Sequence, residues 1–183
     1  MAQFTKIAIK KTFIDLLNEK SFDKITVQEI VSRLGINRNT FYYYYEDKYD
    51  LIKKIFEEEA QKAIDEAHIC QTWKESFANS AKFALENKKA IYHIYNSVNR
   101  EDLEKYLYIV VKNLIILFID SYDTNKKISK TNKDYLVGFY KYAIVGFILD
   151  WISRGMTEDL MVFTGPFEKL FIENIKLVLA NDN

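Results

Sequence analysis

The chain has 183 residues and carries no net charge at pH 7, because 26 basic side chains balance 26 acidic ones. A hydrophobic share of 49% and a charged share of 28% are typical of a soluble globular protein, and this length can bury a real core. The single cysteine, Cys70, excludes an intramolecular disulfide framework and suits a reducing cytoplasm. We expect no signal peptide. The most apolar run, residues 109–119, is far shorter than the roughly 20 residues of a membrane span.

The charge is unevenly distributed along the chain. Residues 1–54 contain ten Lys and Arg against seven Asp and Glu, which gives +3, and the remainder has sixteen against nineteen, which gives −3. A mildly basic N-terminal region suits nucleic-acid binding. Ordinary variation among solvated helix faces would account for the difference equally well, so it supports a motif without replacing one.

One proline and five glycines leave long stretches free of breakers, which predicts an all-α fold. The first helix is expected over residues 5–19. Its apolar residues recur at the spacing of one buried helical face: Ile9, Phe13, Leu16 and Leu17. Phe22 follows a break in the pattern and is expected to pack beneath this N-terminal region.

A short second helix is expected to begin at Thr26, whose hydroxyl is a good N-cap, with Glu29 completing a capping-box pattern. Gly35 is expected to end this helix in the left-handed conformation. Asn37 can then cap a third helix. Two short helices joined by a tight turn form the motif that places its second helix in the major groove of DNA.

The third helix carries residue types that read DNA. Phe41 and Tyr45 lie four residues apart and are predicted to face inward. The outer side carries Arg38, Asn39, Tyr42 and Tyr43, with Thr40 at the flank. Arginine suits guanine, asparagine suits adenine and a threonine methyl suits the thymine methyl, while tyrosine hydroxyls can hold phosphates. Two alternatives remain for the run of four tyrosines: a β-strand, because tyrosine favours strands, and simple core packing.

A fourth helix is expected to begin near Asp47. Lys48 then lies in its first turn, where the positive end of the helix dipole disfavours a cation. A phosphate docked beside the helix N-terminus would explain this placement. A surface lysine without such a role is the alternative.

Residues 25–55 resemble the DNA-binding head of the tetracycline-repressor (TetR) family. The matching pieces fall at the family's spacing: Thr26-Val27-Gln28-Glu29-Ile30, Leu34-Gly35-Ile36-Asn37-Arg38, Thr40-Phe41-Tyr42 and Lys48-Tyr49-Asp50-Leu51. The resemblance implies that Thr26 touches phosphate, that the third helix enters the major groove, and that Tyr42 and Lys48 hold the DNA backbone. The departures from the family pattern are Ser21, Val31, Leu34 and Asn39, of which Asn39 bears on base preference.

The candidate DNA-binding residues are nine side chains of this head: Thr26, Gln28, Asn37, Arg38, Asn39, Thr40, Tyr42, Tyr43 and Lys48. The expected partner is a double-stranded DNA operator built as an inverted repeat. Two domains are predicted, a helix-turn-helix DNA-binding domain over residues 1–50 and a helical body for dimerisation and effector binding over residues 51–183.

In the body, helices are predicted near residues 73–86, 88–97, 103–121, 132–154 and 166–179. The polar or breaker-bearing segments 96–100, 122–129 and 155–165 are read as connections. Residues 143–156 resemble the C-terminal body of a Firmicutes-type TetR subgroup, to which the regulator of dihydroxyacetone kinase genes belongs.

The last two long helices are the expected homodimer interface, chiefly because of the resemblance. Their apolar stripes and two small residues on one face form the candidate set: Leu136, Gly138, Tyr140, Gly146, Phe147, Trp151, Phe167, Leu170, Phe171, Ile175 and Val178. A two-fold interface would set two heads about 34 Å apart, which matches successive major grooves. The alternative is that these stripes pack only within one chain.

The body is also rich in aromatic residues that suit the wall of a small-molecule pocket: Trp73, Phe77, Tyr92, Tyr95, Tyr106 and Phe118. Core packing is the alternative interpretation for them. His68, Cys70 and His93 lack the spacing of metal ligands, so no metal is expected, and no cofactor.

Enzyme classes are disfavoured, because the sequence has no glycine-rich phosphate loop and no serine in a nucleophile elbow. The expected function is that of a cytoplasmic, homodimeric, TetR-like repressor that a small-molecule effector releases from DNA. The alternative is a TetR-like activator or co-regulator-dependent factor whose body binds a partner protein. A helical dimer without any role on DNA is the third hypothesis.

Overall fold

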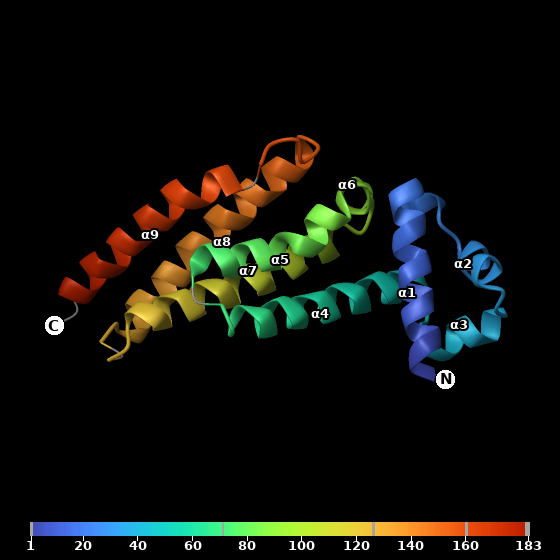
Figure 1. Cartoon of the computed structure of the whole chain (residues 1–183), viewed down its shortest axis with the longest axis horizontal. Coiled ribbons are helices and arrows are strands. Elements are labelled where there is room, and N and C mark those ends of the chain that lie inside the picture. The colour runs from blue at the N-terminus through green and yellow to red at the C-terminus, as the bar shows by residue number, and fades with distance from the viewer. Residues whose placement is uncertain (1, 71, 126, 160, 182–183) are drawn as a thin grey trace. The chain divides into compact units, whose positions relative to one another are not determined.

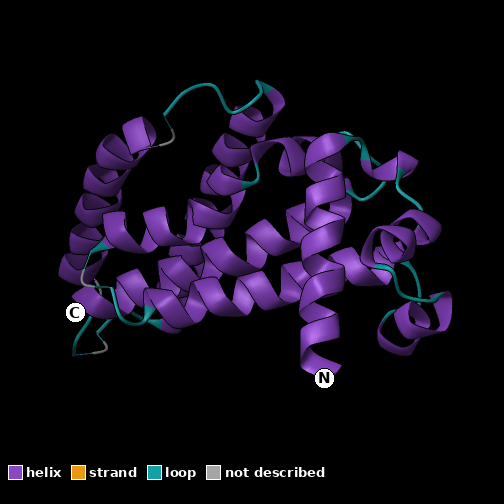
Figure 2. Ribbon diagram, turned by 45° about the vertical axis from the view of Figure 1, so that its right-hand side comes forward, coloured by secondary structure: helices purple, strands orange, loops and turns teal. Residues whose placement is uncertain are grey.

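The computed structural model describes residues 2–70, 72–125, 127–159 and 161–181. Helices and their connections account for all of these residues, with no strand among them (Figure 2), so the all-α prediction is confirmed. The elements in chain order are α1 (Ala2–Glu19), the 3₁₀ helix η1 (Phe22–Lys24), α2 (Val27–Leu34), α3 (Arg38–Tyr44), α4 (Lys48–Ala67), α5 (Trp73–Glu86), α6 (Lys88–Tyr95), α7 (Arg100–Tyr122), α8 (Lys130–Ser153) and α9 (Met161–Asn181).

Two expectations about individual elements are corrected. The four tyrosines of residues 42–45 belong to the helical end of α3 and its C-cap, so the strand alternative is wrong. Helix α9 begins at Met161, within the predicted connection 155–165, and contains Pro166 inside it. Proline removes one backbone donor from a helix, but near the N-terminus the remaining turns still close their hydrogen bonds.

The chain divides into two compact units. The first unit contains Met1–Glu59 and Phe83–Lys105, and the second contains Ala60–Lys82 and Tyr106–Asn183. The first unit therefore extends beyond the predicted boundary at residue 50. The reason is that α6 packs on α1, where the backbone N–H of Ala90 donates to Asn18 Oδ1 over 3.1 Å and His93 Nδ1 lies 2.6 Å from the carbonyl oxygen of Leu17.

The core of the first unit is built around α1, with α2 and α3 beside it (Figure 1). The four predicted core residues of α1 are fully buried, as is Phe22, which meets Phe13 edge-to-face at 6.1 Å. Ile30 of α2 and Phe41 of α3 complete this core. Burial of each such side chain is worth about 1.5–3 kcal/mol, so α1 holds the orientation of the two short helices.

The second unit contains α8 and α9, which run alongside each other (Figure 1). An aromatic cluster lies between them, in which the rings of Tyr140 and Phe171 are 4.1 Å apart and Phe118 lies 5.2 Å from Phe171. The most apolar 18-residue window of α8 has a mean hydropathy of 1.4, so by length and composition alone α8 could cross a membrane. Its buried residues pack inside the second unit, as a core helix does.

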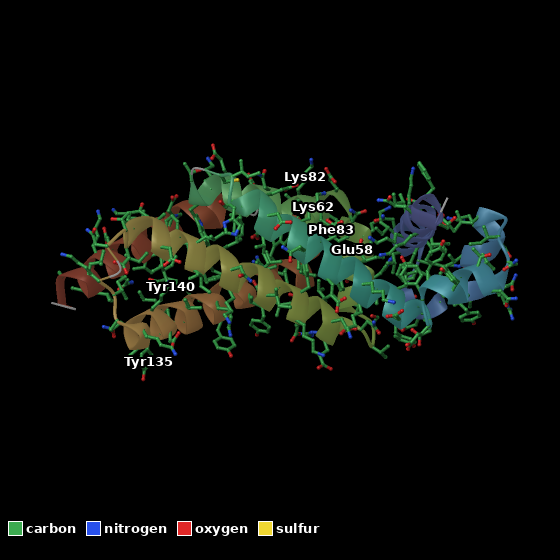
Figure 3. All side chains as sticks on the ribbon, turned by 90° about the horizontal axis from the view of Figure 1, so that it is seen from below. Glu58, Lys62, Lys82, Phe83, Tyr135 and Tyr140 are labelled. Atoms are coloured by element: carbon green, nitrogen blue, oxygen red, sulfur yellow. The ribbon has the colours of Figure 1, made fainter. Side chains whose placement is uncertain are left out.

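Helix α8 has an inner face and an outer face. Figure 3 shows Tyr140 directed toward the neighbouring helices and Tyr135 directed away from them. Tyr140 is 1% exposed and Tyr135 is 75% exposed. Apolar and aromatic residues occupy both faces, so α8 has more apolar surface than its own unit covers.

Candidate nucleic-acid interface

Helix α2 begins as predicted. The Thr26 hydroxyl accepts the backbone N–H of Glu29 over 3.2 Å, which caps the helix N-terminus. The Glu29 carboxylate instead pairs with Lys20 Nζ at 2.5 Å. The capping role of Thr26 is therefore confirmed, whereas Glu29 links α2 to the end of α1.

The turn between α2 and α3 depends on two residues. Gly35 has φ +66° and ψ +27°, the left-handed conformation that disfavours a side chain by about 1–2 kcal/mol. The N–H of Ile36 then donates to the carbonyl of Val31 over 3.0 Å. Asn37 caps α3, because its Oδ1 accepts the backbone N–H of Thr40 at 2.8 Å and the Thr40 hydroxyl at 3.0 Å. The turn fixes the angle at which α3 leaves α2.

Helix α3 separates an inner face from an outer face, as predicted. Phe41 and the following Tyr45 are buried. Tyr42 is 53% exposed and Tyr43 is 79% exposed, and Arg38 and Asn39 are exposed beside them. Among the nine candidate DNA-binding residues, only Thr40 and Lys48 are half-buried, and the other seven are exposed. All nine residues lie in the first unit, and their joint contact with DNA stays a prediction.

A hydrogen bond that periodicity could not predict links the two helices. Arg38 Nε donates to Gln28 Oε1 at 2.7 Å, and Gln28 Nε2 donates to Ser32 Oγ at 2.9 Å. The bond joins residues ten apart and depends on the turn geometry. Helical periodicity predicted that Arg38 faces outward, but it did not predict the contacts with Gln28 and, through it, with Ser32.

Lys48 is held by the backbone of η1 and the residue after it. Its Nζ donates to the carbonyls of Phe22 at 3.0 Å, Asp23 at 3.3 Å and Ile25 at 2.9 Å. The ammonium also lies 4.6 Å from the ring centroid of Phe22, a cation–π contact. Burial lowers the pKa of Lys48 despite the nearby carboxylates of Asp23 and Asp47. These carbonyls explain the cation in the first turn of α4 without a phosphate, and its contact with DNA stays a prediction.

Tyr45, the C-cap of α3, faces inward as predicted, and its side chain is 1% exposed. Tyr45 Oη has no hydrogen-bond partner among the described residues. Burial, followed by the charge of Asp50, raises the pKa of Tyr45 to about 12. The hydroxyl therefore stays neutral, and Tyr45 serves the core.

The predicted dimer-interface residues fall into two groups. Five are buried within one chain, which agrees with the alternative of packing within the chain, and their place in a dimer interface stays a prediction: Leu136, Tyr140, Trp151, Phe171 and Ile175. Phe147 and Leu170 are more than half exposed, Gly146 is exposed, and the remainder of the set, Gly138, Phe167 and Val178, is half-buried. Three further aromatic residues on the outer face of α8 are also exposed: Tyr135, Phe139 and Tyr142.

The predicted pocket residues are not gathered in one place. Trp73 and Phe77 line a cavity of about 590 Å³ between α5, α8 and α9. Trp73 and Phe118 line a second, more polar cavity of about 480 Å³. Tyr106 is buried and lines neither cavity, and α6 places Tyr92 and Tyr95 in the first unit.

The larger cavity is apolar. Its walls include Phe139, Ile144, Phe147 and Leu170, and its hydroxyl group, that of Tyr140, accepts Asn174 Nδ2 at 2.6 Å. The indole N–H of Trp73 is buried without a hydrogen-bond partner among the described residues. In the part of the chain that the structure describes, no three His, Cys, Asp or Glu side chains gather as metal ligands.

Comparison with known proteins agrees with this architecture. Residues 14–55 match the family model described as "Bacterial regulatory proteins, tetR family". Residues 71–172, more than half of the chain, match the model "Transcriptional regulator C-terminal region". The matched segments coincide with the head and most of the body described above.

Individual relatives extend the comparison. The chain is 24% identical over 178 residues to the HTH-type dhaKLM operon transcriptional activator DhaS of Lactococcus lactis subsp. lactis (strain IL1403), covering 96% of this chain and 89% of the relative. It is 32% identical over 82 residues to the uncharacterized HTH-type transcriptional regulator YxbF of Bacillus subtilis (strain 168), covering 44% of this chain and 22% of that relative.

Solved structures show the same fold. A structure of the dihydroxyacetone kinase operon activator DhaS superposes with a TM-score of 0.70 at 25% identity, over 97% of this chain and 95% of that one. A TetR transcriptional regulator from Streptococcus agalactiae 2603V superposes with a TM-score of 0.57 at 21% identity, over 97% and 94% of the two chains. The resemblance noted in the head is thus confirmed over the whole chain, which belongs to the tetR family of bacterial regulatory proteins and is a transcriptional regulator.

Proposed function

We propose that the protein is a cytoplasmic homodimer that binds an inverted-repeat operator and inserts α3 of each chain into the major groove. The observation that carries the proposal is the outer face of α3, where Arg38, Asn39 and two tyrosines are exposed while Phe41 is buried. Arginine and asparagine have the donor and acceptor geometry that distinguishes guanine and adenine in that groove.

The remaining candidate residues fit a role in positioning. Thr26 and Tyr42 lie at the starts or exposed sides of their helices, where hydroxyls can donate to phosphate oxygens. Asn37 and Thr40 bond to each other at the N-terminus of α3, so they hold the helix start that approaches the bases. Phosphate contacts set the register, and base contacts supply the sequence preference.

The homodimer is supported by the exposed apolar surface of α8 and α9. Phe139, Phe147 and Leu170 are each more than half exposed. All three also line the apolar cavity between α5, α8 and α9. A contiguous apolar patch of this kind marks an interaction site in a soluble protein. A two-fold axis through such a surface would bring two heads to one operator, and two heads double the phosphate contacts.

For regulation, we propose a repressor released by an apolar effector in the 590 Å³ cavity between α5, α8 and α9. The volume is that of a drug-sized ligand, and the aromatic walls suit an organic molecule. An effector that binds one spacing of the two heads more tightly shifts the population toward that spacing, and its affinity and the affinity for DNA are then coupled reciprocally.

The proposal is tested by selection of bound duplexes from a random DNA pool at near-physiological salt. An inverted repeat with half-sites about one helical turn apart, or a close multiple, is the expected result. Weak, salt-sensitive binding without a recovered sequence would contradict the proposal for the free protein, and selection would then be repeated with candidate effectors.

A second candidate is an activator whose body binds a co-regulator protein. It is favoured by the similarity, over 96% of the chain, to a relative that is named an operon activator. The same exposed face of α8 would then serve the partner. A transcriptional reporter placed behind the selected site separates the two: deletion of the gene raises expression for a repressor and lowers it for an activator.

A further inference from the structure

Three exposed side chains of the head form a hydrogen-bonded relay that connects α2 to α3. Gln28 and Ser32 lie one turn apart on α2, and Arg38 begins α3. Gln28 Oε1 accepts Arg38 Nε at 2.7 Å, while Gln28 Nε2 donates to Ser32 Oγ at 2.9 Å. We call these residues the Ser32–Gln28–Arg38 relay.

The relay fixes the orientation of the Gln28 amide. A glutamine side chain has one accepting end and one donating end. The Arg38 guanidinium only donates, so it requires the accepting oxygen of Gln28, and a rotated amide would set two donors against each other. The Ser32 hydroxyl can donate or accept, and with this orientation it accepts the donating end, Nε2.

The bond to Gln28 also selects one edge of the Arg38 guanidinium. A guanidinium can form paired hydrogen bonds through Nε with one Nη, or through its two Nη groups. Gln28 occupies Nε, and neither Nη group donates to another described residue. The edge with the two Nη groups is therefore the one left to donate to O6 and N7 of a guanine, the commonest base-specific contact of arginine.

We propose that Gln28 is a positioning residue, which holds Arg38 so that its two Nη groups read a guanine in the major groove. The inference rests on the proposed DNA-binding function. Arginine is among the side chains that lose most rotamer freedom on binding, so a bond already present in the free protein reduces that loss and sharpens discrimination. Gln28 acts through Arg38 and contacts no base itself.

The competing arrangement is direct base reading by Gln28. A glutamine amide can pair with adenine through N6 and N7. Gln28 would then have to release Arg38 and would determine the preference at a base pair of its own. If Gln28 acts through Arg38, the double variant should lose no more discrimination than Arg38→Ala alone. If Gln28 reads its own base, the two losses in binding free energy should add.

The test uses the full-length protein and four duplexes of the selected operator that differ only at the base pair whose preference Arg38→Ala abolishes. Gln28→Ala should lose about tenfold in discrimination at that same base pair, since a bidentate contact is worth about that much or more. Affinity for random duplex and its salt dependence should stay within about twofold. The double variant should match Arg38→Ala alone, because residues that act as one unit are not additive.

Two further variants sharpen the result. Gln28→Glu keeps an acceptor for Arg38, so the guanine preference should persist while the added negative charge weakens binding to all sequences alike. Gln61→Ala removes an exposed glutamine that bonds to Asp65 in the second unit, and it should change neither quantity. A changed preference at a different base pair, multiplied penalties in the double variant, or loss of the guanine preference in Gln28→Glu would each overturn the proposal.

A measurement on the free protein separates failure of the relay from failure of the DNA-binding proposal. In ¹⁵N NMR spectra, the Nε–H of Arg38 should exchange slowly with water in the wild type and rapidly in Gln28→Ala. Rapid exchange in both proteins would overturn the relay, even if an operator is recovered. Slow exchange in the wild type with no operator recovered from the pool would contradict the DNA-binding proposal and, with it, the reading of guanine.

Discussion

The outer faces of α3 and α8 both expose aromatic rings, but the surroundings of those rings differ. On α3, Tyr42 and Tyr43 are exposed beside Arg38 and Asn39, and the neighbouring polar groups are hydrogen-bonded through Gln28. On α8, the exposed rings of Phe139 and Phe147 border an apolar cavity instead.

This difference indicates two kinds of partner. A polar face with fixed donors and acceptors suits a hydrated, negatively charged surface such as DNA, where direction matters. Any contact that removes an apolar face from water lowers the free energy, whatever its direction. Such a face therefore suits another protein chain or an apolar ligand. The same residue type, tyrosine, serves both because it has an apolar ring and a polar tip.

The largest effect is expected at the inner side of α3. Phe41→Ala should lower the free energy of unfolding by about 3–5 kcal/mol, because it leaves a cavity in the core of the first unit. Tyr43→Ala, on the exposed side of the same helix, should change it by less than about 0.5 kcal/mol and weaken DNA binding. Urea unfolding of both variants measures this contrast, and equal losses of stability would contradict the assignment of the two faces.

On α8, Phe139→Glu should shift the protein from dimer to monomer. A charge in the centre of a desolvated interface costs about 2 kcal/mol or more of association free energy. The matched control is Ile109→Glu, which charges an exposed apolar position on α7. Sedimentation equilibrium measures the molar mass of both variants in solution. Unchanged mass for Phe139→Glu would remove α8 from the interface and leave its exposed rings without a dimeric role.

Lys48 combines a structural contact with a predicted DNA contact. Its ammonium is held by backbone carbonyls of the head. Lys48→Met keeps the apolar stem and removes three hydrogen bonds, which should lower stability by about 1–2 kcal/mol. If Lys48 also holds a phosphate, the slope of DNA affinity against salt falls by about one. Lys53→Met, an exposed lysine of the same helix, is the control. Unchanged stability for Lys48→Met would contradict the role of the carbonyls.

The smallest effect concerns acid stability of the head. Burial alone would raise the pKa of Asp50, but bonds from Lys54 and from the N–H of Glu46 lower it below 3.8. A lowered folded pKa adds stability that is present above the unfolded value and is lost as the pH falls through the folded value. Asp50→Asn should therefore lose less stability than the wild type between pH 7 and pH 3, by less than about 1 kcal/mol. An identical acid response in urea titrations would contradict this.

Much of the head could be predicted because local chemistry determines it. Thr26, Gly35 and Asn37 each act on the backbone within a few residues, through caps and a left-handed turn, so their spacing alone predicts the two helices. The inner and outer faces of α3 follow from a period of 3.6 residues.

Other features depend on contacts between distant residues. The carbonyls that hold Lys48 and the bond between Gln28 and Arg38 arise only when separate helices are placed together. On α8 the periodic stripe of Tyr140 and Trp151 is buried, whereas the rings of Tyr135, Phe139 and Tyr142 are exposed. Both stripes are apolar, and hydrophobic periodicity does not distinguish a core from an interface.

The central claim is that the outer face of α3 reads DNA sequence. The most direct test compares wild-type protein with Arg38→Ala on the selected operator and on random duplex at the same salt concentration. Arg38→Ala should lose about 1–3 kcal/mol of binding free energy on the operator and little on random duplex. Equal losses on both DNAs would contradict base reading by Arg38 and reduce its role to attraction of the phosphate backbone.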